Sequence, residues 1–133
     1  MSLSFTARAA GVDDGDCLAA GLAETVDGGG RSLTFQASLY PADEQEVSLG
    51  MDAYCLTTES HATAYGCLDE VVYDAGQLRL VIRPEALDEL GLDDPLIVVQ
   101  VAADPESVNT FREMLREILA YGRPEVRPRM LGL

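Results

Sequence analysis

The segment DPESVNTFREMLREILAYG, residues 104–122, has the features of an amphipathic α-helix from its first residue to its last. Asp104 stands at the N-cap position and Pro105 at the first helical position, where helices favour these residue types. Gly122 stops the helical pattern. Between them, apolar residues recur at helical spacing: Val108, Phe111, Leu115, Ile118 and Leu119. Burying such a stripe is worth about 8–12 kcal/mol before chain entropy is subtracted, so we expect this helix to pack on a sheet.

The residues before this helix show mainly strand patterns. Alternation is clearest in RSLTFQASLY, residues 31–40, where every second residue is apolar from Leu33 to Leu39. Residues 63–74 and 77–83 predict a hairpin, with Gly76 in the left-handed position of its turn. Further strands are expected at residues 3–10, 17–26 and 53–58.

The remaining segments complete the prediction of the fold class. Residues 41–52, PADEQEVSLGMD, are acidic and irregular and predict a loop, whereas PEALDELG, residues 84–91, predicts a short helix. PLIVVQVA, residues 95–102, lacks alternation and predicts a central strand buried on both faces. The sequence therefore predicts an α+β fold, with an antiparallel or mixed β-sheet and with the short helix and the longer C-terminal helix packed on one face.

The length of 133 residues predicts a single domain spanning residues 1–133. We expect residues 1–122 to form its core. The tail at 123–133 is expected to stay flexible or to dock on another chain.

The charge of the chain restricts its partners. Against 23 acidic residues stand 9 bases, all of them arginine, for a formal net charge of −14. Such a field repels nucleic acid and anionic membranes and attracts basic partners. The chain also shows no basic stripe and no apolar run long enough to span a membrane, and its first residues lead us to expect no secretory signal. With three cysteines and no disulfide framework, a reduced, cytoplasmic location is expected.

The segment YCLTTESHATAYG, residues 54–66, holds the only histidine, His61, with Cys55 inside the segment and Cys67 just after it. Zinc sites usually contain a closely spaced ligand pair, and none occurs here. A catalytic cysteine needs a stabilised thiolate, which the acidic surroundings disfavour. We therefore predict no catalytic residue, no metal and no cofactor. A small-ligand or enzymatic domain centred on His61, Cys55 and Cys67 stays open as an alternative.

Several short motifs between about residues 45 and 121 resemble immunity protein family ten of bacterial polymorphic-toxin systems. They are Gly50-Met51-Asp52 before Tyr54-Cys55, the Tyr65-Gly66 step, the leucine-alternating strand at 78–82 and the short helix ending in Leu90-Gly91. The resemblance implies a non-catalytic, cytoplasmic protein that protects its own cell by binding a cognate protein toxin.

The acidic composition then suggests how such a toxin is bound. If the toxin is a basic nuclease, carboxylates of this chain take the places of substrate phosphates, and charge speeds association by about 10- to 1000-fold. The candidate contacts are Asp52, Tyr54, Glu59, His61, Tyr65, Asp69, Glu70 and Asp74. A self-associating structural or adaptor subunit, for example a homodimer, stays open as a second alternative.

Overall fold

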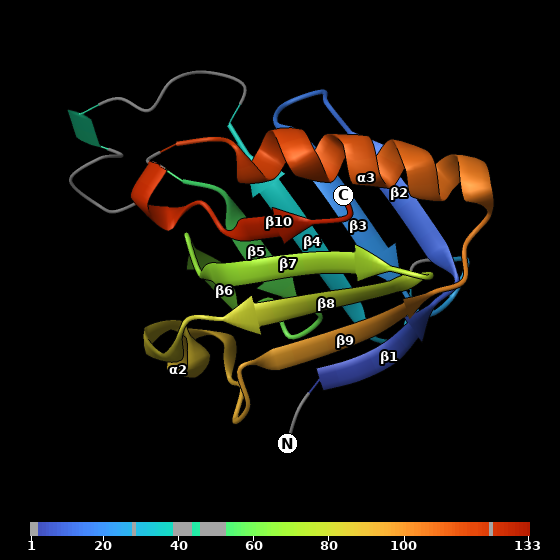
Figure 1. Cartoon of the computed structure of the whole chain (residues 1–133), viewed down its shortest axis with the longest axis horizontal. Coiled ribbons are helices and arrows are strands. Elements are labelled where there is room, and N and C mark those ends of the chain that lie inside the picture. Colours follow the sequence, from blue (N-terminus) through green and yellow to red (C-terminus); the bar gives the residue numbers. More distant parts are fainter. Residues whose placement is uncertain (1–2, 28, 39–43, 46–52, 123) are drawn as a thin grey trace.

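The computed structural model describes residues 3–27, 29–38, 44–45, 53–122 and 124–133, whose strands form two five-stranded sheets (Figure 1). The predicted loop at 41–52 and the inward-facing Leu39 lie outside the described residues, apart from residues 44–45. Sheet A has the order β1-β9-β8-β7-β10 and sheet B the order β2-β3-β4-β5-β6.

Sheet A is mixed. It consists of β1 (Leu3–Ala7), β9 (Leu96–Val101), β8 (Gln77–Ile82), β7 (Leu68–Asp74) and β10 (Arg129–Leu131). The two edge strands, β1 and β10, run parallel to their neighbours, and the three inner strands are antiparallel to one another.

Sheet B is antiparallel throughout. Its strands are β2 (Ala9–Asp13), β3 (Leu18–Ala23), β4 (Ser32–Ala37), β5 (Cys55–Thr58) and β6 (Thr63–Tyr65). The α+β class with an antiparallel or mixed sheet is confirmed, and the strands are divided between two sheets.

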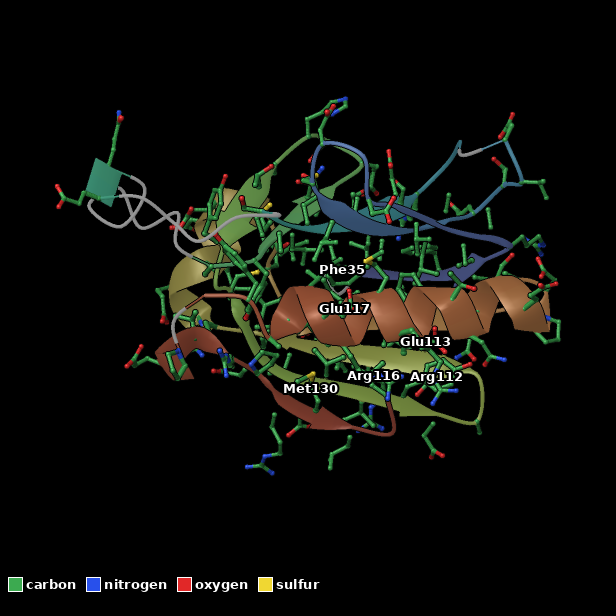
Figure 2. All side chains as sticks on the ribbon, turned by 90° about the horizontal axis from the view of Figure 1, so that it is seen from above. Phe35, Arg112, Glu113, Arg116, Glu117 and Met130 are labelled. Carbon is green, nitrogen blue, oxygen red and sulfur yellow. The ribbon has the colours of Figure 1, made fainter. Side chains whose placement is uncertain are left out.

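The predicted C-terminal helix is confirmed as α3 (Pro105–Leu119). The Asp104 carboxylate accepts a hydrogen bond from the Ser107 amide at 2.9 Å, as an N-cap should. The helix packs against β2, β3 and β4, where Phe111 meets Phe35 edge to face with ring centroids 6.2 Å apart. Figure 2 shows α3 between the two sheets, with Phe35 on one side and Met130 of β10 on the other.

The shorter helical segments follow the predicted proline and glycine signals. Residues 84–91 form the 3-10 turn η1 (Pro84–Ala86) and α2 (Leu87–Leu90), which ends at the left-handed Gly91. Another 3-10 turn, η2 (Pro124–Val126), precedes β10. Like α3, α2 contacts a strand of sheet B, in this case β6.

The core is one apolar cluster built from the inner faces of both sheets and from α3. The predicted alternation is confirmed in β4, where Leu33, Phe35 and Ala37 are buried. It is also confirmed in β8, where the three apolar residues between 78 and 82 that face inward are fully buried.

The prediction for residues 95–102 is correct in that β9 is an inner strand, paired with β1 on one side and β8 on the other. The predicted burial on both faces is wrong. Ile97 and Val99 on one face are inaccessible, but Leu96 on the other is 38% exposed. The sequence shows no alternation here because the outer face of β9 also carries apolar residues. None of the described residues covers that face.

Two segments that were each predicted as one strand prove to be two strands in different sheets. Residues 3–10 form the whole of β1 and the start of β2, and the chain changes sheet at Arg8. Residues 63–74 form β6 and β7, with the change at Gly66 and Cys67. At the second change the alternation is broken, because Gly66, Cys67 and Leu68 are buried one after another.

The second change of sheet is held by Tyr54. Its hydroxyl accepts a hydrogen bond from the Leu68 amide at 3.1 Å and donates one to the Val126 carbonyl at 2.7 Å. The Gly66 amide in turn donates to the Tyr54 carbonyl at 2.9 Å. Tyr54 itself is fully buried. One side chain thus joins β5, the start of β7 and the C-terminal tail.

Residues 124–133 pack against the rest of their own chain. The sequence analysis did not anticipate this arrangement. β10 pairs with β7, and the Arg112 guanidinium donates a hydrogen bond to the Gly132 carbonyl at 2.6 Å. That guanidinium also lies over the Tyr73 ring, 4.4 Å from its centroid. These contacts connect the tail to both β7 and α3.

We expect Gly66→Ala to destabilise the protein more than Gly91→Ala. Both glycines have positive φ, of 58° and 69°, so each alanine costs about 1–2 kcal/mol in backbone strain. A Cβ at Gly66 would also lie 2.9 Å from the Val126 Cβ, whereas a Cβ at Gly91 meets open space. Urea denaturation of both variants measures the difference, and equal losses would contradict the packing at Gly66.

Tyr54→Phe is expected to lower the free energy of unfolding by about 1–3 kcal/mol, because it leaves the buried Leu68 amide and Val126 carbonyl without their partner. Tyr73→Phe is the control, since it keeps the ring under Arg112. Urea titration of both variants tests this prediction. A loss for Tyr54→Phe no larger than for Tyr73→Phe would show that the hydroxyl contributes nothing.

Candidate partner-binding site

His61 lies in the turn between β5 and β6, with an exposed side chain. Its φ of 65° is left-handed, and its amide donates to the Thr58 carbonyl at 2.9 Å. The Thr58 amide closes the turn by donating to the Ala62 carbonyl at 3.0 Å. The histidine therefore occupies a tight, solvent-facing turn.

The two cysteines near His61 in sequence are buried elsewhere. Cys55 begins β5, so the length of this strand, roughly 10 Å, separates it from the turn that holds His61. Cys67 lies between β6 and β7, where the chain changes sheet. Among the described residues, no group of three His, Cys, Asp or Glu side chains is placed to hold a metal ion. The structure does not bring together the three side chains on which the small-ligand alternative depends.

The surroundings of both thiols also disfavour their reactive form. Burial raises the pKa of Cys55 to about 11 and that of Cys67 to about 12. Both side chains are therefore neutral thiols at pH 7, and a thiolate is the form that attacks substrates or binds metals. They serve as small apolar residues of the core.

The candidate contact residues fall into two groups on different sheets. Glu59 and His61 are exposed in the β5–β6 turn, and Tyr65 on β6 is 40% exposed. The others, Asp69, Glu70 and Asp74, belong to β7 of sheet A. Tyr54 is fully buried and is not available as a surface anchor. Asp52 lies outside the described residues.

Two of the three β7 carboxylates face arginines. Asp69 lies 3.6 Å from Arg83, and Glu70 lies 3.8 Å from Arg129. No ion pair of Asp74 or Glu59 is recorded within the described part of the chain. Of the predicted acidic contacts on the described residues, Glu59 and Asp74 thus have no arginine beside them.

The outer face of sheet A is apolar at its centre. The strand register places five apolar side chains on this face: Val72, Val81, Leu96, Val98 and Leu131. Of these, Leu96 is 38% exposed and Leu131 is 50% exposed. Arg79 lies among them, opposite Val72 and Val98. At the end marked by Val81 and Leu96, the connection from β8 to β9 carries the acids Glu85, Asp88, Glu89, Asp93 and Asp94. An apolar centre beside charged groups is the usual anatomy of a protein-binding surface.

The other exposed feature is the edge strand β2. A shallow groove of about 550 Å³ lies on the outer face of sheet B, over β2, β3 and β4, with Gly11, Gly21 and Thr34 among its lining residues. Another groove, of about 320 Å³, separates β2 from the start of α3 and is lined in part by Val12 and Glu106. In Figure 1, β2 is the outermost strand of sheet B and passes behind the first half of α3. The sequence analysis missed this open edge, for which the repeated Ala-Ala-Gly at residues 9–11 and 19–21 is the sequence signal.

The fold and these surfaces describe an acidic α+β protein whose exposed features suit a macromolecular partner. Among the described residues, no helix is long and apolar enough to cross a membrane. A family model described as Immunity protein 10 matches residues 6–109, and the chain belongs to this family. The family suspected from short motifs is thereby confirmed. Neither the curated proteins nor the solved structures contain a match.

We expect the free energy of unfolding to fall as the pH rises from about 8.5 to 10. An unfolded thiol has a pKa near 8.5, so the unfolded chain loses protons there while Cys55 and Cys67 keep theirs. Their contribution is complete below pH 8.5 and is lost as the pH approaches the folded values. Each thiol adds a slope of up to about 1.4 kcal/mol per pH unit. Urea titrations of Cys67→Ala should show that its free energy of unfolding depends less steeply on pH than that of the unchanged protein. An unchanged slope would contradict the raised pKa of Cys67.

Proposed function

We propose that this protein neutralises a cognate protein toxin by binding it, without catalysis. The observation that carries this proposal is membership of the Immunity protein 10 family over residues 6–109. The burial of Cys55 and Cys67, away from the exposed His61, agrees with a binding role.

The net charge of −14 supports a basic partner. Long-range attraction raises the rate at which oppositely charged proteins meet, and exposed carboxylates can occupy the positions that substrate phosphates take in a nuclease cleft. The protein then acts as an acidic plug in that cleft. It is expected to work in the cytoplasm and to bind neither nucleic acid nor membranes.

For the contact itself we favour the outer face of sheet A over the β5–β6 turn. Asp74 and Glu70 lie on this face beside exposed apolar side chains, and the acidic connection around α2 adjoins one end of it. Glu59, His61 and Tyr65 belong to sheet B and form a separate contact group. The two groups lie on different sheets, so we expect only one of them to form the centre of the interface with the toxin.

Co-expression with the product of the neighbouring toxin gene tests the function directly. We expect cells that produce both proteins to grow, and the two proteins to co-purify. A neighbouring product that is harmless, or a toxin that kills despite this protein, would overturn the proposal.

Charge-matched variants test the steering and its location. Glu70→Gln with Asp74→Asn removes two charges from the outer face of sheet A, and Glu113→Gln with Glu117→Gln removes two from the exposed side of α3. We expect the first pair to slow association with the toxin several-fold more than the second, and the difference to disappear above about 0.5 M salt because charges are then screened. Equal association rates, measured by stopped flow, would contradict the chosen face.

A further inference from the structure

The four sheet edges differ in how well they are protected. β6 and β10 are three residues long, and on β1 the Arg31 guanidinium donates a hydrogen bond to the Ser4 carbonyl at 3.1 Å. β2 is five residues long, pairs with β3 alone and contains neither proline nor a basic residue. Short strands, basic residues and proline normally prevent edge pairing, and β2 has none of these; its one charged residue is Asp13, at its end.

The space over β2 is open on the outer face of sheet B, and on the inner face a groove remains between β2 and the start of α3. Gly11, Val12 and Asp13 are all exposed, although successive residues of a strand point to opposite faces. The grooves on the outer face of sheet B and below α3 flank this strand, and a Cβ added at Gly11 would meet no atom within 4 Å. An added strand would find room for its alternate side chains on both sides.

The sequence around β2 is complementary to itself when the strand is turned around. If a second copy pairs in antiparallel fashion about Gly11, then Gly11 faces Gly11 and Ala10 faces Val12 of the other copy. Arg8 then faces Asp14 of the other copy, and this pair occurs twice. In the single chain both side chains are exposed, and within the described residues neither forms a recorded ion pair. Arg8 and Asp14 directly flank β2, so the charges meet when the pairing continues by one residue beyond each end of the strand. Opposite charges in such positions stabilise the pairing.

We propose that β2 is a homodimerisation edge, at which two copies join their B sheets into one continuous sheet through antiparallel β2–β2 pairing centred on Gly11. The occupant is a second copy of this chain, because the charge pattern from Arg8 to Asp14 matches itself in this register. Repulsion between two copies of charge −14 opposes the dimer, but at 0.15 M salt it is screened beyond about 8 Å. The proposed toxin-binding surface is the outer face of sheet A, whereas β2 belongs to sheet B. Dimerisation through β2 therefore leaves that surface accessible to the toxin.

Sedimentation of the full chain at 0.15 M salt and several concentrations tests this proposal. We expect a concentration-dependent dimer that Gly11→Arg abolishes, since two arginines would then face each other. The control is Thr63→Arg, which adds the same charge on the same face of sheet B but at the opposite edge, and should leave the dimer intact. A chain that stays monomeric, or a dimer that Thr63→Arg breaks and Gly11→Arg leaves intact, would overturn the proposal.

A charge swap tests the register. Arg8→Asp and Asp14→Arg should each weaken the dimer about tenfold, because each replaces two attractive pairs by two repulsive ones. The double variant should restore most of the affinity. Hydrogen exchange of the dimer should show new amide protection in residues 9–13 and none in residues 63–65. A double variant no tighter than the single ones, or a dimer without protection in β2, would rule out this pairing.

Discussion

The Tyr54 hydroxyl is the contact on which the arrangement of the two sheets depends. Two of its hydrogen bonds reach the Leu68 amide at the start of β7 and the Val126 carbonyl in the C-terminal tail. The chain leaves sheet B and enters sheet A between these partners, at a glycine against which Val126 packs. A phenol group buried at such a junction needs a donor and an acceptor, and here each comes from a different segment. The hydroxyl thus ties the start of β7 to the C-terminal tail at the point where the chain changes sheet.

Division into two sheets gives the protein two outer faces with different chemistry. Sheet A presents apolar side chains around Arg79, whereas sheet B presents glycine, threonine and other small residues. The only histidine is exposed in a turn, and two cysteines are buried as neutral thiols. A protein of the Immunity protein 10 family with this distribution is suited to binding through its surface. The proposed toxin face and the proposed dimer edge lie on different sheets, so one copy can use both at once.

Local patterns were sufficient for several of the elements and for the fold class. The alternation in β4 and β8, the cap at Asp104 and the glycine after α2 each act over a few residues, and each was confirmed. The strand at β9 was misjudged because apolar residues on an uncovered face look the same in sequence as buried ones. The contact residues on β6 and β7 were taken as one group because they are close in sequence. They belong to two sheets.

The sequence by itself determined the charge, the helix, the inward-facing residues of most strands and the family resemblance, because these depend on composition and short-range order. Tertiary structure alone decided how the strands are shared between sheets, that Tyr54 is buried, that the tail pairs with β7 and that β2 is left as an open edge. Each of these features depends on contacts between segments far apart in the chain. A strand pattern of period two records which side faces the core, but it carries no information on which neighbour the strand will pair with.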